Sequence, residues 1–379
     1  MAIIDPIAYR RIETSYKVSM PTSIRQAFSL EVFEKCGFPT LVDSIVDLRP
    51  FLNTMQDGRF RKYYEELNGL SEFDSQLFIF AVKKHFQVQQ KYFPNKNPIL
   101  PFDILISGLL VAKKLKYFVP NAKKILEIGP GVCQTSFFLK DYLPNLENIS
   151  YVEACQSFYI LQSITLDHIF GERFLEHGHE LSGEEIQWYT PNHFKDPSYG
   201  TIRCNDNSSD FIVSHYPYFK FPDIKKEGNK YDLIMANACL NEISLSALDV
   251  YLSEIKRELI SVGGYLFYQC PGGHHDGRDI VKILNQHGFN PLFVSSINAN
   301  FNIGANAYLS WRTPTPTGLF KFTGHPLDLS ALDTMALSIG HKAYCTEEIL
   351  PALISIHEDS TKNFPYEFFE KNFKNDLNI

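Results

Sequence analysis

The chain lacks paired cysteines, long apolar runs and an excess of positive charge. Its seven cysteines include no Cys-x-x-Cys pair, so we expect neither a disulfide framework nor a zinc knuckle. The longest apolar candidate, residues 104–112, is too short to span a bilayer. Residues 1–14 have no apolar core like that of a signal peptide. These absences predict a cytoplasmic protein that does not act in or on a membrane.

The charge balance argues against a nucleic-acid partner. The chain carries 36 Lys and Arg against 43 Asp and Glu, a formal net charge of -7, whereas binding to phosphates requires clustered cations. One locally basic stretch, Lys113, Lys114, Lys116, Lys123 and Lys124, is interpreted as the solvated face of a helix and its exit loop. We therefore expect no nucleic-acid partner.

Composition and length indicate a folded chain with more than one region. Hydrophobic residues make up 44% of its 379 residues and charged residues 21%, which is enough to bury a full core. We predict a helical region over residues 1–100, an α/β domain over 101–315 and an extension over 316–379. The first region is expected to cap a substrate or to form a homodimer contact, because its aromatic content suggests a pocket or an interface.

Apolar periodicity predicts helices in the first region and alternating strands and helices in the second. The expected helices cover residues 22–35, 43–56, 58–67, 73–93, 101–118, 135–142, 156–169, 245–260 and 279–287. The expected strands cover residues 125–128, 149–152, 231–236 and 265–268, followed by an antiparallel pair, 292–298 with 306–311. Such an alternation is typical of a parallel sheet with crossover helices.

The third strand stays open between two candidates, residues 186–190 and 211–215. The polar stretch between them, residues 191–210, is long for a loop of an α/β domain, and such insertions are often lids or binding loops.

The segment Lys123–Gln134 is the most informative in the chain. It reads as a strand containing Glu127, a Gly-x-Gly turn from Gly129 to Gly131, and the start of a helix. Glycines permit unusual dihedrals and the close approach of a ligand, so this unit is typical of nucleotide binding. The dinucleotide fingerprint requires a further glycine at Gln134. A carboxylate at Glu127 suits a cationic ligand group better than a pyrophosphate.

Two further polar positions end predicted strands. Glu153 follows 149–152, where an acidic side chain can accept hydrogen bonds from both ribose hydroxyls of an adenosine. Asn237 ends 231–236, and the next turn carries Asn241 and Glu242 over the same edge. Because ligands of α/β sheets bind at the carboxyl ends of the strands, these side chains are expected to share one site.

Together these motifs resemble class I, Rossmann-like S-adenosylmethionine-dependent methyltransferases, in particular sugar and small-molecule O-methyltransferases of bacteria. Cys133 stands where that family frequently has a third glycine. The resemblance covers residues 101–311 and implies a seven-stranded sheet, S-adenosylmethionine as cofactor, and transfer of a methyl group to a small-molecule hydroxyl. The implied cofactor-binding residues are Glu127, Gly129, Pro130, Gly131, Glu153, Ala154 and Asn237.

A hydroxyl acceptor benefits from a general base within hydrogen-bond reach. Glu242 is the preferred candidate and His215 the second, with His274 and His275 also considered. No metal is expected, because adjacent histidines in an extended segment point apart. Two alternatives stay open: a catalytically silent methyltransferase-like binding subunit, and an NAD(P)-dependent oxidoreductase.

Overall fold

The computed structural model describes residues 4–18, 20, 22–25, 39–53, 58–178, 211–226, 230–237, 239–240, 242–269, 277–295, 299–302, 310–313, 316–329 and 343–359. The expected insertion 191–210, the strand candidate 186–190 and the residues Asn241, His274 and His275 lie outside these ranges.

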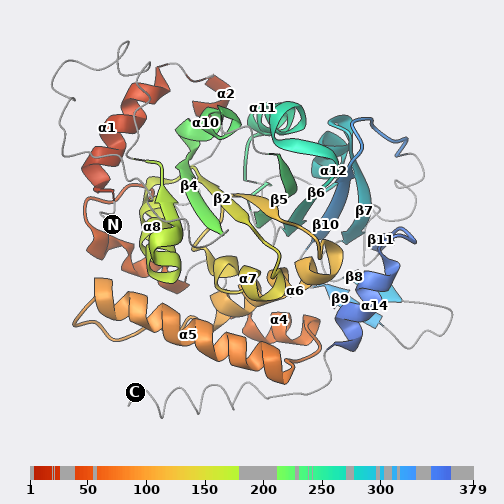
Figure 1. The fold of residues 1–379 in the computed structure, drawn as a ribbon, viewed down its shortest axis with the longest axis horizontal. Coiled ribbons are helices and arrows are strands. Elements are labelled where there is room, and N and C mark those ends of the chain that lie inside the picture. Colours follow the sequence, from red (N-terminus) through yellow and green to blue (C-terminus); the bar gives the residue numbers. More distant parts are fainter. Residues whose placement is uncertain are drawn as a thin grey trace.

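A nine-stranded mixed sheet forms the centre of the molecule (Figure 1). Its order is β11-β7-β10-β6-β5-β1-β2-β4-β3. The strands from β6 to β3 are parallel, while β10 runs antiparallel to both β6 and β7. The bounds are β1 Lys124–Ile128, β2 Asn148–Glu153, β3 Phe174–Glu176, β4 Ile212–Pro217, β5 Tyr231–Asn237, β6 Ile260–Gln269, β7 Phe289–Ser295, β10 Thr317–Phe322 and β11 Ala343–Cys345.

The expectation of seven strands is wrong, because two short strands extend the sheet at its edges. Strand β3 adds to β4 at one edge and β11 adds to β7 at the other, and each has three residues. Segments this short have no apolar period of their own, so only pairing with a longer neighbour defines them. The third parallel strand is β4, which corresponds to the candidate 211–215.

The antiparallel end of the sheet differs from the expected pairing. Strand β7 pairs with β10, and residues 310 and 311, the described part of the expected partner, belong to another strand. Strands β8 (Ala299–Asn302) and β9 (Ser310–Thr313) instead pair with each other in a separate two-stranded sheet. The described residues after 315 therefore supply two strands of the central sheet, β10 and β11.

The helical segments described before the sheet are α1 Pro6–Lys17, α2 Thr22–Arg25, η1 Ile45–Asn53, α4 Phe60–Glu66, α5 Glu72–Tyr92 and α6 Phe102–Phe118. Three of the expected helices are confirmed in α4, α5 and α6. Within the expected helix 43–56, the described residues Ile45–Asn53 form a 3₁₀ helix containing Pro50, a residue that cannot donate a backbone hydrogen bond. A reciprocal capping box between Ser71 and Asp74 begins α5. The expected helix 22–35 can be compared only over α2.

The later helices follow the expected rhythm with two local breaks. Helix α8 is Gln156–Phe170, α12 is Gly277–Gln286 and α14 is Leu350–Glu358. The expected helix 135–142 is split into η2 (Gln134–Phe137) and α7 (Leu139–Tyr142), because Phe138 leaves the helical region with φ -126°. The expected helix 245–260 is α11 (Leu245–Glu254) followed by a π-helical turn, Ile255–Leu259.

Alternating residues of the strands face two separate apolar cores. In β1, Leu126 and Ile128 belong to a core that also contains residues of α1, α8, α11 and α12. Ile125 faces the other core, which contains residues of α4, α5, α6 and α14. Helices thus cover both faces, as a mostly parallel sheet requires. In Figure 1, α1 lies beside α8, and α5 runs along the lower edge of the molecule, where it also contacts α8.

Two of the five lysines assigned to a solvated face are fully buried. The side chains of Lys113 and Lys114 are 0% exposed and pair with Asp74 at 2.7 Å and Glu66 at 2.6 Å, respectively. Helix α6 is buried around most of its circumference, and α4 and α5 supply the two carboxylates. Lys123, in contrast, is exposed as expected. Within the described residues, no helix combines the length and apolarity needed to cross a membrane.

Candidate active site

The turn after β1 uses its two glycines differently. Both have a positive φ, +63° at Gly129 and +61° at Gly131, a region that favours glycine. A Cβ on Gly129 would lie 2.7 Å from the Cβ of Cys239, so packing excludes any side chain there. Among the described residues, the nearest atom to a Cβ on Gly131 would be Gln134 Oε1 at 3.7 Å. Gly131 therefore leaves space that a ligand can approach.

Cys133 also adopts a left-handed conformation, with φ +59°. This is the position at which the resemblance implied a glycine, and the backbone conformation explains that preference. The thiol is fully buried, and burial raises its pKa well above the usual value. A reactive thiolate at this position is thus disfavoured.

Helix α6 supports the turn through a glycine that the sequence analysis missed. A Cβ on Gly108 would lie 2.4 Å from the backbone oxygen of Gln134 and 3.0 Å from the nitrogen of Thr135. Only a glycine allows the two backbones to approach this closely. A lone glycine inside an apolar helix was the available signal.

Glu127 is a deeply buried carboxylate near the end of β1. It is 1% exposed, and neither carboxylate oxygen has a hydrogen-bond partner among the described residues. Burial, followed by the charge of Glu153, raises its pKa to about 8. A buried acid of this kind costs stability unless a ligand satisfies it. An ammonium group is the natural partner, so the residues fit the amino-acid portion of S-adenosylmethionine.

Glu153 ends β2 and is held by three donors. Its Oε1 accepts from the backbone nitrogens of Ala154 at 2.8 Å and Cys155 at 2.9 Å, and its Oε2 accepts from Gln162 Nε2 at 2.6 Å. Burial raises its pKa to about 7, although these bonds act in the opposite direction. The side chain is 6% exposed and therefore fixed in one orientation.

Gln162 connects the glycine turn to Glu153, and the sequence analysis missed it. Its Nε2 also donates to the backbone oxygen of Gly131 at 2.6 Å, while its Oε1 lies 2.8 Å from Nε2 of His215. The other ring nitrogen of His215 lies 3.1 Å from Ser163 Oγ. A buried glutamine in the middle of α8 carries no local sign of this role.

His215 is fully buried and one side chain removed from Glu153. Its ring stacks on Tyr159 with centroids 4.1 Å apart, and both nitrogens have partners. Burial lowers its pKa well below the usual value, so the ring is neutral. Because Gln162 Oε1 can only accept, His215 carries its proton on Nε2. This arrangement suits a residue that positions Gln162.

Asn237 and Glu242 lie at and after the end of β5. Asn237 is 5% exposed, and its Nδ2 has no partner among the described residues. Glu242 is half-buried, and its backbone nitrogen donates to Cys239 at 2.9 Å. Burial, followed by the charge of Glu153, raises the pKa of Glu242 to about 7.

Three carboxylates therefore influence one another at the carboxyl edge of the sheet. Glu127 and Glu242 both respond to the charge of Glu153. In the part of the chain that the structure describes, no lysine or arginine forms an ion pair with any of the three. A cationic ligand would favour the ionised forms of these groups, whereas a pyrophosphate would oppose them.

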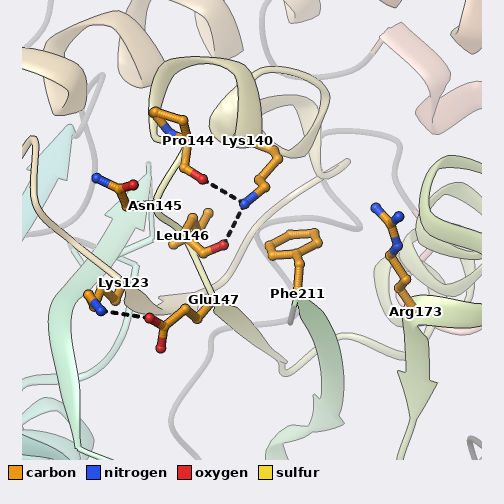
Figure 2. A pocket seen from close by; sticks show the side chains of 8 residues that line it. All are labelled: Lys123, Lys140, Pro144, Asn145, Leu146, Glu147, Arg173 and Phe211. Atoms are coloured by element: carbon orange, nitrogen blue, oxygen red, sulfur yellow. Dashed lines mark hydrogen bonds and ion pairs between the residues drawn. The ribbon is translucent and has the colours of Figure 1, made fainter. Parts of the chain in front are cut away.

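A cavity of about 690 Å³ lies at the amino ends of the parallel strands, before the first residues of β1, β2 and β4 (Figure 2). Lys140 donates there to the backbone oxygens of Pro144 and Leu146, both at 2.8 Å, and Lys123 pairs with Glu147 at 2.7 Å. None of the expected site residues lines this cavity, so it is separate from the candidate active site. The lining residues are Lys123, Lys140, Pro144, Asn145, Leu146, Glu147, Arg173 and Phe211.

No protein-family model and no curated protein matches the sequence. Solved structures similar to the chain include the O-methyltransferase TomG from Streptomyces achromogenes in complex with S-adenosylmethionine, with 14% identity, 72% of this chain and 100% of that chain covered, and a TM-score of 0.35. Precorrin-6y C5,15-methyltransferase from Geobacter metallireducens has 13% identity, coverage of 56% and 87%, and a TM-score of 0.33. A methyltransferase from Pyrococcus furiosus has 14% identity, coverage of 65% and 97%, and a TM-score of 0.33. The solved structures that the chain resembles thus include class I S-adenosylmethionine-dependent methyltransferases.

Proposed function

We propose that this protein is an S-adenosylmethionine-dependent methyltransferase whose acceptor is a hydroxyl group of a small molecule, such as a sugar or a secondary-metabolite intermediate. The observation that carries the proposal is Glu127, whose two buried carboxylate oxygens have no partner among the described residues. It lies beside a glycine turn that is open at Gly131.

The proposed cofactor contacts follow from the charge at each position. Glu127 would hold the cationic amino group, Gly131 would allow close approach of the backbone, and Glu153 would accept from the ribose. Ala154 would lie beside the adenosine, because its backbone nitrogen already orients Glu153. Asn237 would donate to the bound cofactor through Nδ2, which has no partner among the described residues.

Methyl transfer requires alignment, exclusion of water and removal of a proton. When bound, S-adenosylmethionine supplies an electrophilic methyl group on a sulfonium. Glu242 would accept the proton that the acceptor hydroxyl loses, since a base whose pKa is about 7 is matched to neutral pH. The buried edge around it would keep water away from the reacting groups.

The same charges argue against the oxidoreductase alternative. A dinucleotide would bring a pyrophosphate to an edge that carries three carboxylates. A catalytically silent binding subunit remains the second alternative, and it predicts cofactor binding without turnover on any acceptor.

Calorimetric titration of the full chain tests the cofactor. S-adenosylhomocysteine should bind with micromolar affinity, about -8 kcal/mol, and NAD should give no binding heat. Glu127→Gln keeps the shape of the side chain and removes its charge, so its affinity for S-adenosylhomocysteine should fall by tens-fold. Binding of NAD without S-adenosylhomocysteine would refute the proposal.

A further inference from the structure

Glu153 has acceptor capacity left for only one ribose hydroxyl. A carboxylate offers about four acceptor positions. The chain fills three of them through the nitrogens of Ala154, Cys155 and Gln162. A ribose presents two neighbouring hydroxyls, so the second needs a partner elsewhere.

The N-terminal region meets the chain directly after Glu153. Gln156, the first residue of α8, donates through Nε2 to the backbone oxygen of Pro6 at 2.8 Å. Its Oε1 accepts from the backbone nitrogen of Val42, also at 2.8 Å. The backbone oxygen of Thr40 accepts from the nitrogen of Ser157 at 3.3 Å. Two N-terminal segments are therefore fixed to the first turn of α8, beside the expected ribose position.

Tyr9 lies one turn along α1 from the contact at Pro6, and its side chain is fully buried. The side chain is 0% exposed, and Oη has no hydrogen-bond partner among the described residues. Its ring packs between Tyr159 at 5.2 Å and Phe219 at 5.4 Å, measured between centroids. A buried phenol usually has a partner. The lack of one for Tyr9 Oη among the described residues therefore indicates that a ligand supplies it.

The electrostatics agree with this position. Burial raises the pKa of Tyr9 well above its usual value, and the nearby charges of Glu13 and Glu153 act in the same direction. Tyr9 is therefore a neutral phenol that can both donate and accept. The neighbouring Tyr218 differs, because its hydroxyl already donates to Glu13 at 2.8 Å.

We propose that Tyr9 of the N-terminal helix binds one hydroxyl of the cofactor's ribose while Glu153 binds the other. This inference rests on the proposed function and assigns the N-terminal region a direct part in cofactor binding. The ribose site is then shared between two segments of the chain, α1 and the end of β2.

A double-mutant cycle between protein and ligand tests the contact. S-adenosylhomocysteine and its 2′-deoxy and 3′-deoxy ribose analogues are titrated into the wild-type chain and into Tyr9→Phe. Tyr9→Phe should weaken binding of S-adenosylhomocysteine about fivefold. One of the two deoxy analogues should bind the wild type about fivefold more weakly than S-adenosylhomocysteine does. The same analogue and S-adenosylhomocysteine should bind Tyr9→Phe with equal affinity, because the variant has already lost the contact. Losses that multiply for both analogues, or an unchanged affinity in Tyr9→Phe, would overturn the assignment.

Tyr218→Phe is the matched control. Tyr218 also packs against Phe219, but its hydroxyl already donates to Glu13. It should leave the discrimination between the analogues unchanged. Tyr9→Phe removes no bond present in the ligand-free chain, so its melting temperature should match that of the wild type. Failure of the wild type to bind S-adenosylhomocysteine would refute the proposed function as well. Losses of affinity that multiply for both analogues would refute only the role of Tyr9.

Discussion

Gln162 Nε2 lies 2.6 Å from Glu153 Oε2 and thereby fixes the carboxylate at the end of β2. The same nitrogen lies 2.6 Å from the backbone oxygen of Gly131. One amide thus fixes the distance between the glycine turn and Glu153, the carboxylate that is expected to bind the ribose. His215 fixes the orientation of that amide, because its Nε2 is bonded to Gln162 Oε1.

Replacing Gln162 should remove the connection between the glycine turn and Glu153. Gln162→Met keeps a similar volume but removes the donor to Glu153 Oε2 and the partner of His215 Nε2. We expect the free energy of unfolding to fall by about 1–3 kcal/mol and the affinity for S-adenosylhomocysteine to fall about tenfold. Denaturant unfolding and calorimetry measure the two effects. Ser163→Ala removes the partner of the other nitrogen of His215 and a bond to the backbone oxygen of Tyr159, but it leaves the bonds of Gln162 in place, so affinity should stay within about twofold. An unaffected Gln162→Met would contradict the positioning role.

The two glycines of the turn should respond differently to the same substitution. Alanine at either position meets a positive φ, which costs about 1–2 kcal/mol. Gly129→Ala also drives a methyl group against Cys239, so it should lower the melting temperature more than Gly131→Ala does. Gly131→Ala should instead weaken binding of S-adenosylhomocysteine, and Gly131→Val should abolish it. Unchanged affinity in a folded Gly131→Val protein would refute the assignment of this turn.

Binding of the cofactor should release a proton near neutral pH. In the free protein the pKa of Glu127 is raised to about 8, so at pH 7 the side chain is mostly protonated. Pairing with an ammonium requires the ionised form. S-adenosylhomocysteine should therefore release close to one proton at pH 7, and its affinity should rise between pH 6 and pH 8. Calorimetry in buffers of different ionisation enthalpy measures the proton count, which should fall sharply in Glu127→Gln.

The same carboxyl should make the ligand-free protein less stable as pH rises. The unfolded side chain has a pKa of 4.5 and the folded one about 8. Between these values the folded state retains a proton that the unfolded state has lost, so the stabilisation is complete below 4.5 and declines up to about 8. Denaturant unfolding of Glu127→Gln across this range should show a weaker decline than the wild type. A parallel decline in both proteins would assign the effect to other groups.

Local sequence patterns were sufficient to predict the strands that have a clear pattern of apolar residues. Glu127, Glu153 and Asn237 were all expected at the ends of strands, and each lies at or next to the end of β1, β2 or β5. This succeeds because apolar runs fix the strands, and parallel strands bring their carboxyl ends to one edge. The edge strands β3 and β11 were missed because three residues have no period.

Interactions between distant segments could not be predicted in this way. Helical spacing shows that Lys113 and Lys114 share one helix, but it does not show that Asp74 and Glu66 arrive from two other helices to pair with them. Tyr9 was missed for the same reason, since only the tertiary fold brings α1 to the first turn of α8.

The roles of Glu242 and His215 should separate in steady-state kinetics. A screen of hydroxylated small molecules, read out by formation of S-adenosylhomocysteine, would supply an acceptor. If Glu242 is the base, kcat/KM should rise with pH to a plateau above about 7, since burial raises its pKa to that value. Glu242→Gln should flatten this rise and lower kcat at least tenfold while S-adenosylmethionine still binds. His215→Phe should instead raise KM for S-adenosylmethionine, because His215 reaches the site only through Gln162. A loss of kcat in His215→Phe with an unchanged KM would restore His215 as a catalytic candidate.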